Sequence, residues 1–265
     1  MAAACGEQAD VFVTEQAGHA RELARAARAG GARLVVAWGG DGTVNEVASA
    51  LAFGDAHFAI VPAGSGNGLA RELAISADPA AALTSALRAA PRTIDAGEID
   101  GRLFVNLAGI GFDAHVAAQF NAPDNRRRGL AGYAILTARA LARYAVARYD
   151  IVTPDSRQSV RALLIVLANG CEFGNRIRIA PGACVDDGAL DLVVVEERTR
   201  LATVWSMRRL VRGSVDRAAA WSSRRVQRVA IESHAPMMFH VDGEAIQGGT
   251  RLEARVHPGA LKICV

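Results

Sequence analysis

The first third of the chain alternates between apolar runs typical of buried strands and patterns typical of helices. The alanine-rich residues 17–29 favour a helix that ends at the paired Gly30 and Gly31. Residues 33–38 (RLVVAW) read as a buried strand, and beyond the glycine turn at 39–43 apolar residues recur at helical spacing. The pattern therefore predicts a strand, a glycine turn and a helix in succession.

The same order returns in the next segment. Residues 57–61 (HFAIV) form a second strand-like run, residues 62–68 (PAGSGNG) a second glycine loop, and a helical pattern starts at Leu69. Parallel neighbouring strands need a crossover helix, so two such units in tandem predict a parallel α/β sheet. Ligands of such sheets gather at the carboxyl ends of the strands.

Beyond Pro91 the pattern changes to strands in succession, with one expected helix at 130–148. This order predicts a second, mostly antiparallel β domain. We therefore expect an α/β domain over residues 1–93 and a β domain over residues 94–265. The expected strands of the β domain are 103–107, 162–167, 190–195, 226–231, 237–241 and 252–256.

Composition narrows the class of protein. The chain has 265 residues, 51% of them hydrophobic, and a formal charge of +3, which is too small to indicate nucleic acid. No apolar stretch approaches the ~20 residues that span a bilayer. Cysteines without a C-x-x-C pair, and a start without signal-peptide character, favour the cytoplasm. The basic run Arg126–Arg128 is either a solvated loop or a contact for anionic lipid headgroups.

The first glycine loop, Gly39 to Glu46 (GGDGTVNE), has the makeup of a phosphate site. Glycines allow a close backbone approach, so that amide N–H groups and the positive end of a helix dipole can converge on an anion. Asp41 would repel a bare phosphate, which suggests a divalent cation or a substrate hydroxyl beside it. The alternative is a tight turn with a helix-capping Asp or Thr. The second loop adds Ser65 and Asn67 as donors.

Acidic residues also surround glycines in the predicted β domain. Asp242 and Glu244 flank Gly243, although Asp-Gly is equally a common hairpin signal. His240, two residues before Asp242, could orient that carboxylate or simply pack. Asp113 is expected to cap a helix that begins near Ala114. A further group, Asp186, Asp187 and Asp191 around Gly188, would be self-repelling unless a cation or hydrogen bonds relieved it.

Taken in order, these segments resemble the diacylglycerol kinase catalytic-domain superfamily, which includes soluble bacterial lipid kinases and the sphingosine and ceramide kinases. NAD kinases and phosphofructokinases carry something similar to GGDGT alone. The ordered set is specific and covers nearly the whole chain. Its members are GGDGTVNEV at 39–47, PAGSGNGLAR at 62–71, GIGFDAHV at 109–116, NG at 169–170, IAPGACVDDGALDLVVV at 179–195 and VDGE at 241–244.

The resemblance implies an α/β nucleotide-binding domain and a β-sandwich lipid domain with the active site in a cleft between them. It implies ATP and Mg²⁺ as cofactors. Asp242 and Glu244 match the acidic pair near the transferred phosphoryl group, one of them the general base, and Asp41 matches part of the acidic network at the phosphates. The implied Mg²⁺ site combines the Asp187 side chain with the carbonyls of Cys184 and Ala189. The implied ATP site comprises Thr14, Gly39, Gly40, Asp41, Gly42, Thr43, Val44, Asn45, Glu46, Gly64, Ser65, Gly66 and Asn67.

Two segments depart from the family pattern. The N-P-x-S-G loop that usually opens bacterial members is absent, so either the start is misplaced or truncated or the nucleotide site is incomplete. The second loop reads G-S-G-N instead of G-T-x-N-D, closer to sphingosine-type kinases. We predict an ATP-dependent kinase for a diacylglycerol-like or sphingoid lipid at the membrane surface, with a homodimer as a possible state. The alternatives are a kinase for a soluble alcohol such as NAD, or a non-catalytic member that binds lipid or nucleotide.

Overall fold

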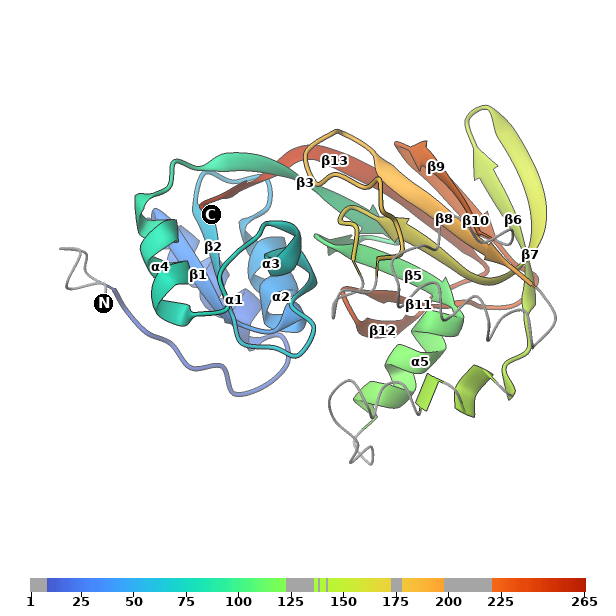
Figure 1. Ribbon diagram of the computed structural model, residues 1–265, viewed down its shortest axis with the longest axis horizontal. Helices are drawn as coiled ribbons and strands as arrows, with labels where there is room; N and C mark the ends of the chain where they lie inside the picture. The colour runs from blue at the N-terminus through green and yellow to red at the C-terminus, as the bar shows by residue number, and fades with distance from the viewer. Residues whose placement is uncertain (1–8, 123–135, 138, 142, 173–177, 198–220) are drawn as a thin grey trace.

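The computed structural model describes residues 9–122, 136–137, 139–141, 143–172, 178–197 and 221–265 (Figure 1). Within them the named helices are α1 (His19–Ala29), α2 (Asp41–Leu51), α3 (Gly68–Glu72), α4 (Pro79–Arg88) and α5 (Phe112–Asn121). The strands are β1 (Leu34–Gly39), β2 (His57–Pro62), β3 (Arg92–Ile99), β4 (Arg102–Phe104), β5 (Leu107–Gly111), β6 (Ala147–Thr153), β7 (Ser156–Ala168), β8 (Leu190–Glu196), β9 (Trp221–Val226), β10 (Arg228–Glu232), β11 (Met238–Val241), β12 (Glu244–Gln247) and β13 (Arg251–Ile263).

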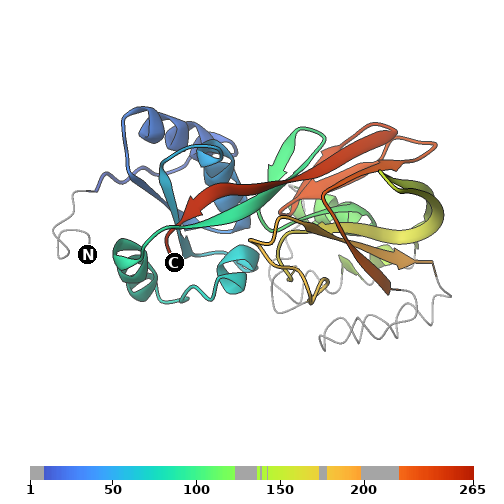
Figure 2. The ribbon, with the colours of Figure 1, turned by 90° about the horizontal axis from the view of Figure 1, so that it is seen from above.

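The N-terminal α/β unit confirms the predicted parallel pairing. β1 and β2 run parallel, from the pair Leu34 and His57 to the pair Gly39 and Pro62. Alternate residues of these strands face opposite sides, since side chains alternate along a strand. Phe58 packs with α1 and α2, whereas Ala59 packs with α4 on the other face. Helices thus cover both faces, as the apolar strands require, and Figure 2 shows the two helix layers on either side of the strands.

The second unit is mostly antiparallel, as predicted. β6, β7, β8 and β9 pair in succession, and β5 pairs with both β7 and β11. Its core is built from inward-facing residues, among them Phe104 of β4 and Ile110, Ile165 and Phe239 of β5, β7 and β11. This β sandwich carries α5 against β11 and β12.

Two long strands join the units. β13 pairs antiparallel with β10 and β3, and its end pairs parallel with β2 through Ile263 and Phe58. Leu261 and Ile263 lie in the core of the first unit. Figure 2 shows β3 and β13 running from one unit into the other. Because both units share these strands, the division at residue 93 stays a prediction.

Three sequence-based expectations for elements need correction. The strand expected at 103–107 is two strands, β4 and β5, separated by Val105 and Asn106. The helix expected to run to Arg148 ends earlier, since Ala147–Thr153 is β6, which pairs with β7 and β10. In β6, Tyr149 and Ile151 alternate into the core, and that period of two defines a strand. Helix α4 was not predicted, and α5 begins at Phe112, two residues before the helix expected near Ala114.

The expected helix at 130–148 is described only in part, and residues 130–135 lie outside the description, as does Arg126–Arg128. The described helical residues of this segment are 136, 137, 139–141 and 143, and Ala140 among them packs against α5. Arg139 and Arg143 are exposed, so this segment covers the sandwich with its arginines in solvent. Among the described helices none is long and apolar enough to cross a membrane.

Candidate active site

The two glycine loops lie in contact with each other. They follow β1 and β2, whose ends are aligned at Gly39 and Pro62. A Cβ atom added to Gly64 would stand 2.6 Å from the Cα of Gly40, and one added to Gly40 would stand 3.2 Å from the Cα of Gly64. This approach leaves no room for a side chain at Gly64, which explains a glycine there.

Asp41 ties the first loop to the second. It is the first residue of α2, whose N-cap Gly40 makes no side-chain cap. The Asp41 carboxylate accepts the N–H of Asn67 at 2.9 Å through Oδ2 and the N–H of Gly68 at 2.7 Å through Oδ1. Asp41 therefore caps the neighbouring helix α3, not its own, which corrects the capping alternative considered from the sequence.

The second loop is closed by its own asparagine. Asn67, at a φ of 54°, accepts the N–H of Gly64 at 2.9 Å and donates to the Gly64 carbonyl at 2.8 Å. Asparagine tolerates this left-handed backbone better than most residues. Ser65 lies exposed at the tip of the loop. Two hydrogen bonds between Asn67 and Gly64 therefore close the loop.

Other residues of the expected nucleotide set have structural partners elsewhere. Glu46 accepts the N–H of Gly18 at 2.7 Å and of Arg21 at 3.3 Å, at the start of α1. A carboxylate stabilises that helix end through the unpaired amides and the helix dipole. Thr14 lies exposed ahead of the same helix. A role of either residue toward ATP stays a prediction.

The Asp242–Gly243 pair forms the two-residue turn of the β11–β12 hairpin. Val241 pairs with Glu244, and Asp242 and Gly243 have φ values of 46° and 91°. Positive φ at both central residues is the signature of a type I′ turn, which favours Asp-Gly. The hairpin alternative is therefore confirmed, yet the Asp242 side chain is buried inside the protein.

Four donors surround the Asp242 carboxylate. Oδ1 accepts the N–H groups of Asn106 at 3.0 Å and Leu107 at 2.9 Å. Oδ2 accepts the N–H of Val105 at 2.9 Å and Nδ2 of Asn45 at 2.8 Å. Burial raises the pKa of Asp242 above its ordinary value, and these hydrogen bonds oppose the rise. With four hydrogen bonds made, both oxygens are engaged by the protein itself.

These contacts bring the glycine loops and the acidic turn to one place. Asn45 lies one turn beyond Asp41 in α2 and reaches across to Asp242. In the second loop, a side chain at Gly68 would overlap the amide of Asn106, whose own N–H bonds Asp242. Asp41 and Asp242 therefore border the same junction between the two units.

Glu244 differs from Asp242 in its surroundings. It opens β12 on the far side of the turn and is exposed. Within the described part of the chain, no hydrogen bond or ion pair engages its carboxylate. Of the predicted acidic pair, Glu244 is the member whose oxygens are available to a ligand.

The turn around Gly188 is relieved of its charge repulsion by hydrogen bonds and arginines. Asp187 pairs with Arg225 and accepts the N–H of Ala189 at 3.1 Å. Asp186 lies 3.4 Å from Arg92, and the third carboxylate, Asp191, bonds the Ser223 hydroxyl at 3.0 Å. In the described ranges no three His, Cys, Asp or Glu side chains are grouped to hold a metal ion.

Sequence reasoning missed Asp95, which anchors this turn. It is buried on β3, and it accepts the N–H of Gly188 at 2.7 Å and of Gly259 at 2.8 Å. Asn169, from the NG motif, donates to the Asp95 carbonyl at 3.0 Å. The available signal was an aspartate between the apolar Ile94 and Ala96, because a buried carboxylate needs partners.

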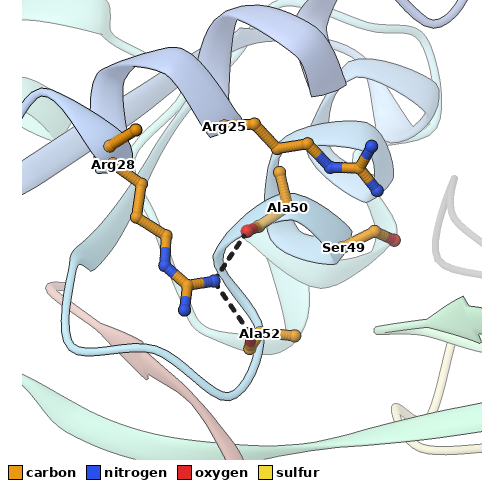
Figure 3. A pocket seen from close by; sticks show the side chains of 6 residues that line it. Arg25, Arg28, Ser49, Ala50 and Ala52 are labelled. Atoms are coloured by element: carbon orange, nitrogen blue, oxygen red, sulfur yellow. Dashed lines mark hydrogen bonds between the residues drawn. The ribbon is translucent and has the colours of Figure 1, made fainter.

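A surface pocket lies elsewhere, at the C-terminal ends of α1 and α2 (Figure 3). Arg28 donates to the carbonyls of Ala50 at 3.2 Å and Ala52 at 3.4 Å, at the end of α2, where the last carbonyls of a helix lack partners within the helix. Arg25 and Ser49 line the same pocket. It sits at the opposite end of α2 from Asp41 and is separate from the junction.

The α/β unit with its two glycine loops is joined to a β sandwich that carries acidic turns, and the two units meet where Asn45 contacts Asp242. Two family descriptions match the chain: "Diacylglycerol kinase catalytic domain" over residues 1–99 and "YegS C-terminal NAD kinase beta sandwich-like domain" over residues 106–265. The chain therefore belongs to the family of lipid kinases with a diacylglycerol kinase catalytic domain. Membership makes it a phosphotransferase and confirms the resemblance seen in the sequence.

Similar proteins agree with this assignment. "Probable lipid kinase YegS-like" of Pseudomonas aeruginosa is 35% identical over 97% of this chain and 85% of the relative. The protein of the same name from Chromohalobacter salexigens is 32% identical over 97% of this chain and 83% of the relative.

Solved structures support the fold. A diacylglycerol kinase from Bacillus anthracis superposes with a TM-score of 0.74 at 19% identity, covering 99% of this chain and 86% of that one. An NAD kinase from Archaeoglobus fulgidus in complex with ATP gives 0.57 at 11% identity, covering 100% and 86%. At these identities the likeness concerns the fold alone.

Proposed function

We propose that the protein is an ATP-dependent kinase that phosphorylates a hydroxyl group of a diacylglycerol-like or sphingoid lipid, with Glu244 as the general base. One observation carries the proposal. The Asn45–Asp242 hydrogen bond joins the helix of the first glycine loop to the turn that presents Glu244.

The glycine loops are the proposed site of the ATP phosphates. Main-chain amides at the N-terminus of α2, together with those of Ser65 and Gly66 in the second loop, favour anions there. The fixed shape of the second loop, closed by Asn67 and held by Asp41, supports this role, since a preformed site costs less ordering on binding. Ser65 is exposed and free to donate to a phosphate.

In the proposed reaction the lipid hydroxyl oxygen attacks the γ-phosphorus of ATP. A new oxygen–phosphorus bond forms, the bond from the γ-phosphorus to the bridging oxygen breaks, and ADP leaves with that electron pair. The Glu244 carboxylate accepts the hydroxyl proton. A carboxylate is adequate because the transition state is loose, so that positioning and charge matter more than basicity. Asp242 acts as a positioning residue, because its oxygens are occupied.

Mg²⁺ fits the donor chemistry of the turn before Leu190. A carboxylate from Asp187 and the carbonyls of Cys184 and Ala189 form the all-oxygen set that Mg²⁺ prefers. Asp187 would exchange its exposed Arg225 partner for the ion. A bound Mg²⁺ would offset the negative charge of this turn.

The acceptor is proposed to be taken from the cytoplasmic membrane surface. Arg139 and Arg143 are exposed on the segment that covers the sandwich, where cationic side chains are attracted to anionic headgroups. The relatives named as lipid kinases support a lipid acceptor. The predicted homodimer stays a prediction.

Phosphate transfer from labelled ATP tests the proposal. The protein, ATP and Mg²⁺ are incubated with vesicles of a total lipid extract, and in parallel with diacylglycerol, with sphingosine and with NAD. We expect a labelled lipid and no labelled NADP. Label in NADP alone would make the protein a kinase for a soluble alcohol. Nucleotide binding without transfer to any acceptor would make it a non-catalytic member.

A further inference from the structure

We propose that His240, held by Asp113, is a positioning residue that fixes the Asp242–Gly243 turn and thereby aims Glu244. The inference rests on the proposed function, in which Glu244 is the base. Both side chains are buried in the β domain and neither contacts the glycine loops through any hydrogen bond of the described chain.

The two ring nitrogens of His240 have different partners. Nδ1 accepts the N–H of Gly243 at 3.3 Å, and Nε2 lies 3.2 Å from Oδ2 of Asp113. Because Nδ1 accepts, the ring proton sits on Nε2, which donates it to Asp113. The other Asp113 oxygen accepts the N–H of Ala114 at 2.9 Å, which fixes the carboxylate at the start of α5. Asp113 was expected to cap this helix, but it lies inside it, since α5 begins at Phe112 with Gly111 as its N-cap.

A glycine makes room for this pair. Gly109 of β5 stands directly opposite His240 of β11 in the antiparallel register. A Cβ atom at position 109 would overlap Oδ2 of Asp113 and approach Nε2 of His240 to 2.6 Å. The space that a side chain would fill is therefore taken up by the histidine–carboxylate contact. The need for a glycine at position 109 is an observation separate from the hydrogen bonds, and it supports the same contact between His240 and Asp113.

Two contacts from different parts of the protein hold the turn, besides the pairing of Val241 with Glu244. The Asp242 side chain is bound by the junction, and the Gly243 amide is bound by His240. Glu244 follows Gly243 directly, so the position of the turn sets the position of the Glu244 main chain. The Glu244 carboxylate is left available to a ligand. If the His240 contact is lost, Asp242 and the pairing of Val241 with Glu244 still hold the hairpin, but one of the contacts that set the position of the Gly243 amide next to Glu244 is missing.

A buried histidine that only packs would affect stability alone. A positioning residue predicts a lower kcat with an unchanged KM for ATP, because the nucleotide loops are untouched. A misplacement of about 1 Å can cost roughly 100-fold in rate. We therefore expect H240L to lower kcat by about 10- to 100-fold and to change the KM for ATP by less than about twofold.

Two conservative variants separate the two contacts. Asparagine places an acceptor oxygen near the Nδ1 position and should keep the Gly243 contact, whereas glutamine places a donor near the Nε2 position and should keep only the Asp113 contact. We expect H240N to retain kcat within about threefold and H240Q to lose about 10-fold or more. If H240L does not fold, the comparison of H240N with H240Q still tests whether the Gly243 contact of His240 supports catalysis. Equal kcat values, or the reverse order, would overturn the proposal.

A double-mutant cycle shows whether His240 acts through Glu244. If it does, H240L added to E244Q lowers the residual rate by less than about twofold, because the group it positions is already disabled. An equal loss in both backgrounds would contradict positioning. The matched control is H257L, which removes another histidine–carboxylate contact, His257 to Glu98 at 2.8 Å, distant in sequence from the turn; its kcat should match the wild type.

The failures are distinguishable. If the wild-type protein transfers no phosphate, or E244Q keeps the wild-type kcat, the proposed function itself fails. If E244Q loses activity while folded H240L keeps the wild-type kcat, only the role of His240 fails.

Discussion

The β domain contains two Asp-Gly turns that look alike in sequence and differ in place. Asp242–Gly243 and Asp187–Gly188 both carry a glycine at positive φ, 91° and 72° respectively. The first aspartate is buried and accepts four hydrogen bonds, whereas the second is exposed and pairs with an exposed arginine.

The difference lies in what distant segments supply. Asp242 finds its donors 135 to 197 residues away in sequence, on the backbone between β4 and β5 and on α2. Asp187 finds Arg225 38 residues away, at the surface. Asp-Gly at 242–243 therefore joins the two domains, whereas the Asp187 carboxylate of the other turn can exchange its arginine partner for another cation. Local sequence determines the turn, and the groups that the fold brings to the aspartate determine the role of its carboxylate.

The largest expected effect comes from D242A. Removing the carboxylate leaves three buried amides and the Asn45 side chain without their acceptor, and each such group costs about 1–3 kcal/mol. We expect the free energy of unfolding to fall by about 4 kcal/mol. Urea unfolding measures it, with D187A as the matched control, which should lose less than about 1 kcal/mol. Equal losses would erase the distinction between the turns.

N45A tests the link between the domains with a smaller effect. It leaves Oδ2 of Asp242 and the carbonyl of Leu103 short of a donor, so we expect a loss of about 2 kcal/mol. S49A is the control on the same helix, since the Ser49 contact to Asn45 is long at 3.5 Å, and it should stay within about 0.5 kcal/mol of wild type. If N45A unfolds like S49A, the interdomain hydrogen bond does not stabilise the protein.

Mg²⁺ should stabilise the protein through Asp187. At a free concentration about five times the dissociation constant, a bound ion adds about 1 kcal/mol. We expect Mg²⁺ to raise the Tm of the wild type and of D186N, which keeps the proposed ligands, but not of D187N. Thermal unfolding with and without Mg²⁺ measures this without any assay of activity. A shift in D187N as large as in D186N would place the ion elsewhere.

The smallest effect belongs to R225A. Arg225 and Asp187 form an ion pair with the arginine side chain 58% exposed, so its removal should cost less than about 1 kcal/mol. If Asp187 exchanges partners as proposed, R225A should bind Mg²⁺ more tightly than the wild type, which titration calorimetry measures. Weaker binding would show that the arginine supports the site instead of competing for it.

The sequence predicted what short-range periodicity determines. The units β1–α2 and β2–α3 follow from apolar runs broken by glycines, and their loops fall where the strands end. The Asp-Gly hairpin at 242–243 followed from residue type alone. In each case the determining residues are neighbours in the chain.

What the sequence could not predict depends on distant partners. Ala147 and Arg148 continue a helical pattern locally, but pairing with β7 makes them a strand. Likewise no local signal shows that Asp41 caps α3, or that Asp95 binds Gly188 from 93 residues away. The role of each acid depends on whether the fold gives its oxygens a partner.

The proposed catalysis needs a free carboxylate at Glu244 beside an occupied one at Asp242, and E244Q tests this most directly. Single-turnover transfer from ATP to lipid is compared with equilibrium ATP binding, with E253Q as the control at another exposed carboxylate. General-base catalysis is worth about 10²- to 10⁴-fold. We expect a loss in that range for E244Q with unchanged ATP affinity. Wild-type transfer by folded E244Q would contradict the account.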